Sequence, residues 1–269
     1  MKKRPFQFIS AFGALLVFCN FLSVAVMAQS NPKTLKVMTY NIHHGNPPER
    51  PGVIDLPAIA AVIKQHTPDL VALQEIDKLT KRTGQVDQLK TLAELTGMFY
   101  FFSKGIDFEG GEYGVGILSR YPINSSNRYP LPSKAGLDAE ARSLAVVQVT
   151  LPNGKPLNFA STHLDLNNEH RMLQVKEINR LLGSKKGDVI LAGDLNLTST
   201  TPAMKILEQH FTRSCTENCA PTIPQDVPTE EIDFILLKKG SRMKVISHQV
   251  FPNIDASDHL PVMAIYQLP

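Results

Sequence analysis

Hydrophobic residues along the chain follow both strand-like and helix-like spacing, which predicts an α/β protein. Short apolar runs predict strands at residues 35–40, 70–73, 113–118, 143–150, 157–162, 189–192, 232–237, 243–247 and 262–266. Apolar residues three or four positions apart predict helices after Asp55, at residues 86–96 and 169–182, and after Thr201-Pro202. Asn153-Gly154, between two of the strands, is typical of a hairpin turn.

Polar side chains stand at the ends of several of these strands. Those that follow a strand are Asn41, Glu75, His163, Asp194 and Asn196, and those that precede one are Asp233, Asp258 and His259. A single shared site requires that the second group of strands run opposite to the first. We therefore expect mixed or antiparallel sheets in an α/β layered fold, with a polar rim at one sheet edge.

The rim is rich in carboxylate and amide oxygens, which favours a hard divalent metal. Magnesium binds through one or two carboxylates and keeps several waters, whereas zinc usually recruits several histidines or cysteines. Each motif alone also has an ordinary structural explanation. Gly193-Asp194-Leu195-Asn196 is typical of an Asx turn, and Gln74-Glu75 of a helix cap or a surface pair. Their joint occurrence at strand ends is what favours a catalytic site.

The first 28 residues have the pattern of a cleavable secretory signal. Residues 2–4 are basic, residues 8–26 are nearly all apolar, and Val26-Met27-Ala28 offers small residues for cleavage before Gln29. A membrane anchor is the alternative, because the apolar run approaches the roughly 20 residues that a span requires. Residues 29–269 contain no repeat or long linker, which predicts a single domain. The signal pattern predicts a secreted or periplasmic location.

Composition narrows the class of protein further. The chain has 43% hydrophobic residues and three cysteines, which excludes disordered, collagen-like and disulfide-knot classes. Its 28 basic residues exceed its 25 acidic ones by the three in the predicted signal, so the mature chain has no net formal charge. This balance disfavours a broad nuclease. In an exported chain, Cys215 and Cys219 favour a local disulfide, and a metal site with His210 is the alternative.

Taken in order, the motifs closely resemble those of the endonuclease/exonuclease/phosphatase superfamily, over about residues 35–268. The motifs that carry the resemblance are Met38-Thr39-Tyr40-Asn41-Ile42, Leu73-Gln74-Glu75-Ile76-Asp77, residues 113–120, Ser161-Thr162-His163-Leu164-Asp165, Gly193-Asp194-Leu195-Asn196, Ile232-Asp233-Phe234-Ile235 and Ser257-Asp258-His259-Leu260-Pro261-Val262. The resemblance implies a four-layered deoxyribonuclease-like sandwich, with two mixed or antiparallel β-sheets flanked by helices. It also implies hydrolysis of phosphoesters with a divalent metal.

The resemblance assigns three residues to the metal. Glu75 is similar to the principal metal ligand of the family, and Asn41 and Asp258 are similar to residues beside the metal. The implied cofactor is Mg²⁺ or Mn²⁺. Whether one ion or two operate is left open.

The resemblance assigns the chemical steps to a second group of residues. Asp194 resembles the residue that orients or deprotonates the attacking water. Asn196 and His163 are expected to contact the phosphoryl oxygens, and Asp233 to hold His259 in its working tautomer. His259 is left either as a phosphate-binding group or as a general acid.

Several neighbouring residues are candidates for substrate contact. His43 and His44 would face the metal or the phosphate, or else form a solvent-facing turn. Arg142 resembles an arginine of the family and is a candidate phosphate contact. Residues 222–232 resemble a loop of small secreted bacterial members, which we expect to support Asp233 by packing. The basic residues behind Glu75 would line a substrate path or form a solvated face; they are Lys78, Lys81 and Arg82.

The substrate is narrowed mainly by exclusion. The segment before Asp233, Thr229-Glu230-Glu231-Ile232, lacks the Trp-Cys-Asp-Arg signature of inositol polyphosphate phosphatases, and Ile76-Asp77 replaces the Thr-Lys of abasic-site endonucleases. The chain has no Trp for stacking on bases. We therefore expect a small or lipid phosphodiester substrate. A lipid substrate would be compatible with peripheral contact between the protein and a lipid surface. The sequence indicates no protein partner. The alternatives are a secreted nuclease and a non-catalytic protein that binds a phosphorylated ligand.

The first prediction concerns export. We expect the secreted protein to begin at Gln29, because small residues precede that position, and to carry a Cys215 to Cys219 bridge. Intact-mass measurement of the secreted protein, with and without reductant, checks both points. An uncleaved amino terminus would contradict the first, and two free thiols would contradict the second.

Overall fold

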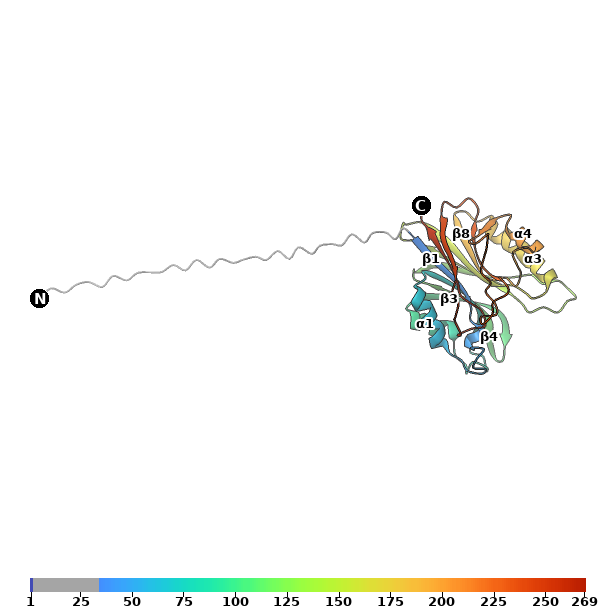
Figure 1. The fold of residues 1–269 in the computed structure, drawn as a ribbon, viewed down its shortest axis with the longest axis horizontal. Helices are drawn as coiled ribbons and strands as arrows, with labels where there is room; N and C mark the ends of the chain where they lie inside the picture. Colours follow the sequence, from blue (N-terminus) through green and yellow to red (C-terminus); the bar gives the residue numbers. More distant parts are fainter. Residues whose placement is uncertain (2–33) are drawn as a thin grey trace. The chain divides into compact units, whose positions relative to one another are not determined.

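Two six-stranded β-sheets lie face to face, and helices cover their outer faces (Figure 1). The computed structural model describes Met1 and residues 34–269 of the 269-residue chain. The predicted signal peptide, beyond Met1, lies outside the described residues. The expected four-layered arrangement of two sheets and flanking helices is confirmed.

The first sheet is built largely from the amino-terminal half of the chain. Its strands lie in the order β11, β12, β1, β2, β4, β3. Their bounds are Lys244–Val250, Val262–Gln267, Thr34–Asn41, Leu70–Lys78, Gly111–Ser119 and Phe99–Phe108. The two carboxyl-terminal strands, β11 and β12, therefore complete a sheet that the amino-terminal strands begin.

The second sheet comes from the middle of the chain. Its strands lie in the order β5, β6, β7, β8, β10, β9. Their bounds are Ile123–Pro130, Ser143–Thr150, Pro156–His163, Asp188–Asp194, Asp233–Lys238 and Phe211–Arg213. The predicted hairpin is formed by β6 and β7, which pair antiparallel around Asn153-Gly154.

Both sheets are mixed, as the positions of the polar residues predicted. Strands β1 and β2 are parallel, and β12 runs antiparallel beside β1. In the second sheet β7 and β8 are parallel, and β10 runs antiparallel beside β8. The carboxyl ends of four strands and the amino ends of two others therefore meet at one edge of the sandwich.

The main hydrophobic core fills the space between the sheets. Because side chains alternate across a strand, Val37 of β1 faces this core, together with Phe159 of β7 and Ile190 of β8. The next residue of β1, Met38, faces the opposite side, where the first pair of helices packs. This alternation fixes which face of β1 each residue occupies, up to Asn41 at its end.

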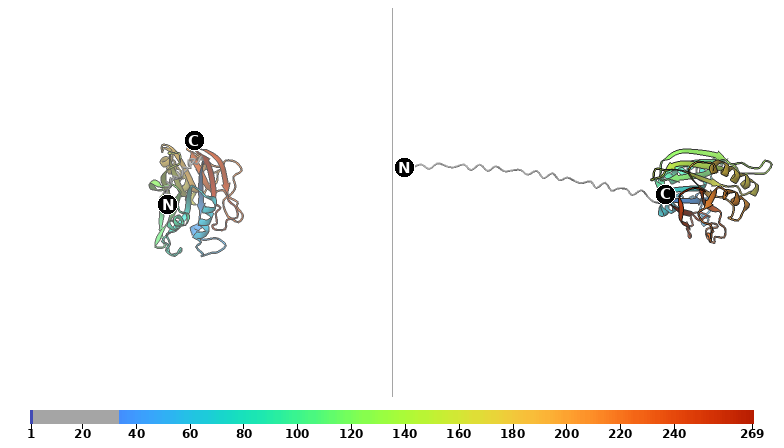
Figure 2. Two further views of the ribbon diagram at one scale, coloured as in Figure 1. Left: turned by 90° about the vertical axis from the view of Figure 1, so that its left-hand side faces the viewer. Right: turned by 90° about the horizontal axis from the view of Figure 1, so that it is seen from above.

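Helices cover the outer face of each sheet (Figure 2). α1 (Leu56–His66) and α2 (Gln88–Thr96) pack on the first sheet. α3 (Asn168–Ile178) and α4 (Pro202–Leu207) pack on the second, and a π-helical turn, η2 (Asn179–Gly183), follows α3. A 3₁₀ turn, η1 (His43–Gly45), follows β1 at the polar edge.

Helix starts follow the capping rules. Asp55 accepts a hydrogen bond from the backbone nitrogen of Ala58 and caps α1, and Asp87 caps α2 in the same way through Lys90. α2 therefore begins at Gln88 and not at Val86 as the apolar pattern predicted. Gly97 ends it in the left-handed conformation, at φ 68°.

Three strands had no sequence prediction: β3, β5 and β9. β3 and β5 are edge strands, and most of their side chains are exposed or half-buried. A strand in that position needs no buried face, and β5 shows neither a continuous apolar run nor a clean alternation. β3 opens with the aromatic run Phe99-Tyr100-Phe101-Phe102, a strand signal that our sequence prediction did not use. β9 has only three residues, too few to show a period.

The described helices include none that is long and apolar enough to cross a membrane.

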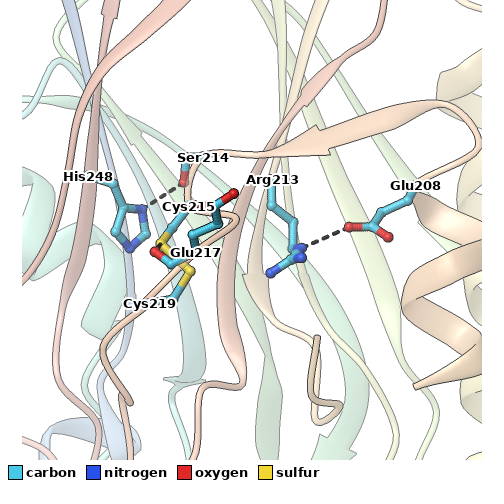
Figure 3. The surroundings of a disulfide bond; sticks show 7 residues. All are labelled: Glu208, Arg213, Ser214, Cys215, Glu217, Cys219 and His248. Atoms are coloured by element: carbon cyan, nitrogen blue, oxygen red, sulfur yellow. Dashed lines mark hydrogen bonds and ion pairs between the residues drawn. A yellow bond between two sulfur atoms is a disulfide. The ribbon is translucent and has the colours of Figure 1, made fainter. Parts of the chain in front are cut away.

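Cys215 and Cys219 are joined in a disulfide, in the segment between β9 and β10. Figure 3 shows this bridge beside His248, whose Nδ1 lies 2.8 Å from Ser214 Oγ. The disulfide closes a short loop, since its cysteines are four positions apart.

The inter-sheet core makes a prediction about stability. Phe159 is fully buried, whereas Phe99 on the edge strand β3 is 50% exposed. Phe159→Ala should lower the free energy of unfolding by about 3–5 kcal/mol, because it removes a large buried side chain and leaves a cavity. Phe99→Ala, the matched control, should change it by less than about 1 kcal/mol. Denaturant unfolding of both variants checks this, and equal losses would contradict the assignment of the core.

Candidate active site

Strand register places the predicted catalytic residues side by side. His163 ends β7 and pairs with Asp194, the last residue of β8. Asp194 also pairs with Asp233, the first residue of β10. Asn41 ends β1 in the other sheet and lies next to Gln74 of β2. Four polar residues that are far apart in sequence therefore meet where the two sheets face each other.

Glu75 lies within β2, at an irregularity in its pairing with β4. The register shifts between Leu73 and Ile76, which is the pattern of a β-bulge. Glu75 itself has φ 57°, in the left-handed region that non-glycine residues rarely adopt. The bulge takes the Glu75 side chain out of the regular alternation of β2, and its carboxylate is 21% exposed.

Asn41 connects the two sheets through its amide. Its Nδ2 donates hydrogen bonds to Glu75 Oε1 and Asp194 Oδ2, both at 3.0 Å, and lies 3.4 Å from His259 Nε2. Its Oδ1 accepts a hydrogen bond from the backbone nitrogen of His43 at 3.1 Å. Asn41 is fully buried. In this arrangement it orients two carboxylates, and its assignment as a metal ligand stays a prediction.

Asp233 and His259 form a buried pair. Asp233 Oδ2 lies 2.9 Å from His259 Nδ1 and also accepts a hydrogen bond from Thr222 Oγ1 at 2.6 Å. Burial lowers the pKa of His259, but the carboxylates of Asp233 and Asp194 outweigh this effect and raise the pKa to about 10. The ring is therefore an imidazolium near neutral pH. Thr222 lies in the loop that we expected to support Asp233, and it does so by a hydrogen bond.

His163 has the opposite protonation state. Burial, and then the nearby Arg142 guanidinium, lower the pKa of His163 to about 3, so the ring is neutral. Asn196 Nδ2 lies 2.9 Å from His163 Nε2 and donates to the carbonyl oxygen of Leu164. Because an amide nitrogen is only a donor, His163 Nε2 must accept, which leaves the ring proton on Nδ1. Asn196 thus positions His163 in this structure.

Asp194 lies at the centre of these groups and is 1% exposed. Its Oδ1 accepts from the backbone nitrogen of Asn196, and its Oδ2 lies 3.4 Å from His163 Nε2 and 3.7 Å from His259 Nε2. Burial, followed by the Asp233 carboxylate, raises the pKa of Asp194. A carboxylate with a raised pKa and charged neighbours is the kind of group that accepts a proton during catalysis.

His43 and His44 form the 3₁₀ turn η1 and lie beside the carboxylates. His44 Nδ1 is 3.8 Å from Glu75 Oε2, and His43 Nδ1 is 3.9 Å from Asp258 Oδ1. Burial would raise the pKa of Glu75, but the neighbouring His44 and His163 imidazoles and the Asn41 amide hold that pKa well below its usual range. Glu75 is therefore ionised, as a metal ligand must be.

Arg142 lines a narrow pocket together with His163 and Tyr113. Its Nη1 lies 2.9 Å from Glu140 Oε1, and its side chain is 9% exposed. Within the described part of the chain its Nε is a buried donor without a hydrogen-bond partner. An unused guanidinium donor next to His163 suits an anionic ligand.

The basic residues behind Glu75 do not gather at this edge as free charges. Arg82 forms an ion pair with the buried Asp77 and lies over the ring of Phe108. Lys78 forms an ion pair with Glu112. For two of these three residues, which we expected either to line a substrate path or to form a solvated face, the structure therefore shows ion pairs with acidic neighbours.

Two groups of side chains have the composition and spacing to hold a metal ion. One is Asp194, Asp233 and His259, all buried; the other is His43, His44 and Glu75, all half-buried. Glu75 fits a divalent ion because its carboxylate is ionised, is partly exposed and keeps Oε2 beyond hydrogen-bond distance of His44. Asp258 lies on the same side, 3.9 Å from His43. The donor set thus fits a metal site and leaves the identity of the ion open.

Supporting residues at the site carried no clear sequence signal. Gln88 is buried and joins the backbone of Asp77 to that of His44 through its amide. Ser257 donates to the carbonyl oxygen of Asn41. A polar residue at a helix start and a serine before an aspartate are common on protein surfaces. Only the tertiary structure shows that these two are buried.

Comparisons with known proteins agree with this geometry. The uncharacterized protein YbhP of Escherichia coli strain K12 is 25% identical over 253 residues, which cover 88% of this chain and 97% of YbhP. The crystal structure of endonuclease/exonuclease/phosphatase from Beutenbergia cavernae is 26% identical, with a TM-score of 0.71, and covers 88% of this chain and 72% of that one. The mannosyl-6-phosphatase of Bacteroides thetaiotaomicron has a TM-score of 0.70 at 19% identity, covering 87% of this chain and 100% of that one.

The family match includes every residue that the structure brings to the site. It extends over residues 38–259, from the strand that ends at Asn41 to the His259 ring that pairs with Asp233. The chain therefore belongs to the Endonuclease/Exonuclease/phosphatase family.

Proposed function

We propose that this protein hydrolyses a small or lipid-borne phosphodiester by metal-assisted attack of water. The observation that carries the proposal is the Asn41 amide. Its nitrogen donates a hydrogen bond both to the Glu75 carboxylate and to the Asp194 carboxylate, and so holds the two side by side. This arrangement sets an ionised carboxylate suited to a metal beside a buried carboxylate suited to a proton. Hydrolysis of a phosphoester needs both groups at one place.

The metal side of the site consists of Glu75 and Asp258. Mg²⁺ or Mn²⁺ held there would polarise a phosphoryl oxygen and neutralise its charge. Asn41 keeps the Glu75 carboxylate in place through Oε1 and leaves Oε2 for the ion. Asp258 is 35% exposed, so it can reach an ion without leaving a buried partner unpaired.

The protein groups opposite the metal orient water and stabilise charge. Asp194 is the acceptor for a proton of the attacking water, because its pKa is raised and its Oδ2 faces the site. His259, held as an imidazolium by Asp233, supplies positive charge to the phosphoryl group. His163 keeps its Nδ1 proton as a neutral donor, and Arg142 adds a guanidinium beside it.

Charge around the site favours a small substrate over a long nucleic acid. Arg82 and Lys78 are paired with Asp77 and Glu112. A nuclease that grips a polymer needs free cations along many phosphates. The secreted nuclease therefore remains the second candidate. What supports this candidate is membership of a family that includes endonucleases and exonucleases by name.

Exposed aliphatic side chains on the loops around the site favour a lipid-borne substrate. Leu166 follows β7 and is 74% exposed, Val227 precedes β10 and is 67% exposed, and Leu79 follows β2 and is 48% exposed. Each lies on a loop that joins a strand bearing a site residue. An acyl-chain interface on these loops would give the three exposed side chains an apolar partner, which an aqueous polyanion would not.

We also propose that the protein works outside the cytoplasm. The residues before Gln29 have the pattern of a cleavable signal. The Cys215–Cys219 disulfide supports this location, because such bonds persist in oxidising compartments.

The metal assignment predicts a specific loss of activity. Chelation should abolish turnover of an aryl phosphodiester, and added magnesium or manganese should restore it. Glu75→Gln should lower kcat/KM by roughly 10²- to 10³-fold, the range found when one charge-stabilising group is removed, with an unchanged circular dichroism spectrum. Glu94→Gln, on the exposed face of α2, is the matched control and should behave as the wild type. Full activity of Glu75→Gln would refute the assignment.

The substrate assignment predicts a particular ranking of substrates and a weak salt dependence. Phospholipid vesicles and aryl phosphodiesters should be hydrolysed faster than plasmid DNA or phosphomonoesters. Binding through many phosphates would lose roughly 10³- to 10⁵-fold in affinity between about 50 and 200 mM salt. Rapid DNA cleavage with that steep dependence, and negligible turnover of the small diesters, would favour the nuclease instead.

The lipid-borne substrate can be separated from the soluble one. Leu166→Ser should reduce hydrolysis of vesicle phospholipid and leave hydrolysis of the soluble aryl diester unchanged. Leu95→Ser, at an exposed position of α2, is the control. Equal effects of the two variants on vesicles would exclude a lipid contact through Leu166.

A further inference from the structure

The turn after β1 brings two imidazoles to the Glu75 carboxylate. One nitrogen of His43, one of His44 and one oxygen of Glu75 all lie within 4.8 Å of one another. All three residues have positive φ, at 45°, 42° and 57°. Neighbouring non-glycine residues rarely adopt this conformation, and strained backbone of this kind concentrates at functional sites.

Buried hydrogen bonds hold the turn in this conformation. Gln88 Nε2 donates to the carbonyl oxygen of His44, and Gln88 Oε1 accepts from the backbone nitrogen of Asp77 in β2. The backbone nitrogen of Gly45 donates to the carbonyl oxygen of Ile42 at 2.7 Å. The two histidines are therefore fixed to the strand that carries Glu75, and they do not form a free surface loop.

The surroundings of the His43 and His44 rings leave a nitrogen of each available to a ligand. His43 Nδ1 lies 2.9 Å from the carbonyl oxygen of Asn46, which can only accept, so Nδ1 carries the proton and Nε2 the lone pair. Metal-binding histidines usually donate their second nitrogen to a carbonyl in this way. His44 Nδ1 is buried without a hydrogen-bond partner in the described residues and is 3.8 Å from Glu75 Oε2.

We infer that His43 and His44 join Glu75 in a mixed nitrogen and oxygen site that selects a transition metal ion of the Co²⁺ or Zn²⁺ class over Mg²⁺. Carboxylate and amide oxygens alone would suit Mg²⁺, which accepts nitrogen ligands poorly. Two imidazoles and one carboxylate form a common donor set for zinc and its neighbours. The inference rests on the proposed function in taking Glu75 as a metal ligand, and it replaces Mg²⁺ by an ion of the Co²⁺ or Zn²⁺ class as the preferred occupant.

Metal binding without substrate tests the site directly. Isothermal titration of the purified protein with Zn²⁺, Co²⁺ and Mg²⁺ should give transition-metal affinities well above the Mg²⁺ affinity. His43→Asn and His44→Asn, singly and together, remove the imidazoles, and asparagine tolerates the left-handed backbone. The double variant should lose roughly 10- to 100-fold or more of its Zn²⁺ affinity and keep its Mg²⁺ affinity within about threefold. It should also lose the Co²⁺ absorption bands of the wild type.

Controls separate loss of ligands from loss of folding. His210→Asn changes an exposed histidine outside both candidate metal groups and should bind Zn²⁺ as the wild type does. Glu75→Gln should weaken all three ions. Thermal unfolding of His44→Asn without metal should match the wild type, since the clamp by Gln88 uses the backbone of His44 and not its ring. A circular dichroism spectrum like that of the wild type shows that the other variants are folded.

The outcomes distinguish this inference from the proposed function. A double variant with wild-type Zn²⁺ affinity and Co²⁺ spectrum would overturn the site, whatever the enzyme hydrolyses. A wild type that binds Mg²⁺ as tightly as Zn²⁺ would overturn the selectivity. A protein that binds Zn²⁺ through both histidines but hydrolyses no phosphoester would refute the proposed function and leave the site standing.

Discussion

The site depends on one buried side chain, the amide of Asn41. It lies between the two sheets and donates to a carboxylate from each, Glu75 of the first sheet and Asp194 of the second. Two carboxylates that face each other in a buried space repel, and both lose hydration. A neutral donor shared between them offsets part of that penalty without adding a charge. The relative position of the sheets at this edge is therefore tied to the geometry of the site.

Unusual backbone conformation is concentrated around this contact. His43, His44, Glu75 and Asn196 all have positive φ, although none is a glycine. Each of these residues lies next to a pair of regularly hydrogen-bonded strands, which holds its backbone in this unfavourable conformation. The pair is β1 and β2 for His43, His44 and Glu75, and β7 and β8 for Asn196. The strain turns side chains away from the alternating faces of the strands and toward the site.

Two histidines a few ångströms apart have opposite charge states, and their partners explain the difference. His259 is bonded to the Asp233 carboxylate and faces Asp194, so its proton is retained despite burial. Burial, and then the nearby Arg142 guanidinium, lower the pKa of His163, so its protonated form is disfavoured, and its Nε2 accepts from the neutral Asn196 amide. One ring can supply positive charge and the other a neutral donor, without any difference in residue type.

The sequence by itself determined the mixed sheets and the identity of the polar residues at the strand ends, because apolar periodicity and residue order are local properties. The four layers were implied by its resemblance to a known family. From the sequence we did not predict the edge strands β3 and β5, which have no fully buried face. Nor could it predict that Gln88 is buried against η1, that Asn41 turns its nitrogen to both carboxylates, or that Arg82 is paired with Asp77. Those outcomes depend on which groups burial brings together across the two sheets. Only the tertiary structure decides them, because hydrogen-bond partners and desolvation are set by neighbours far apart along the chain.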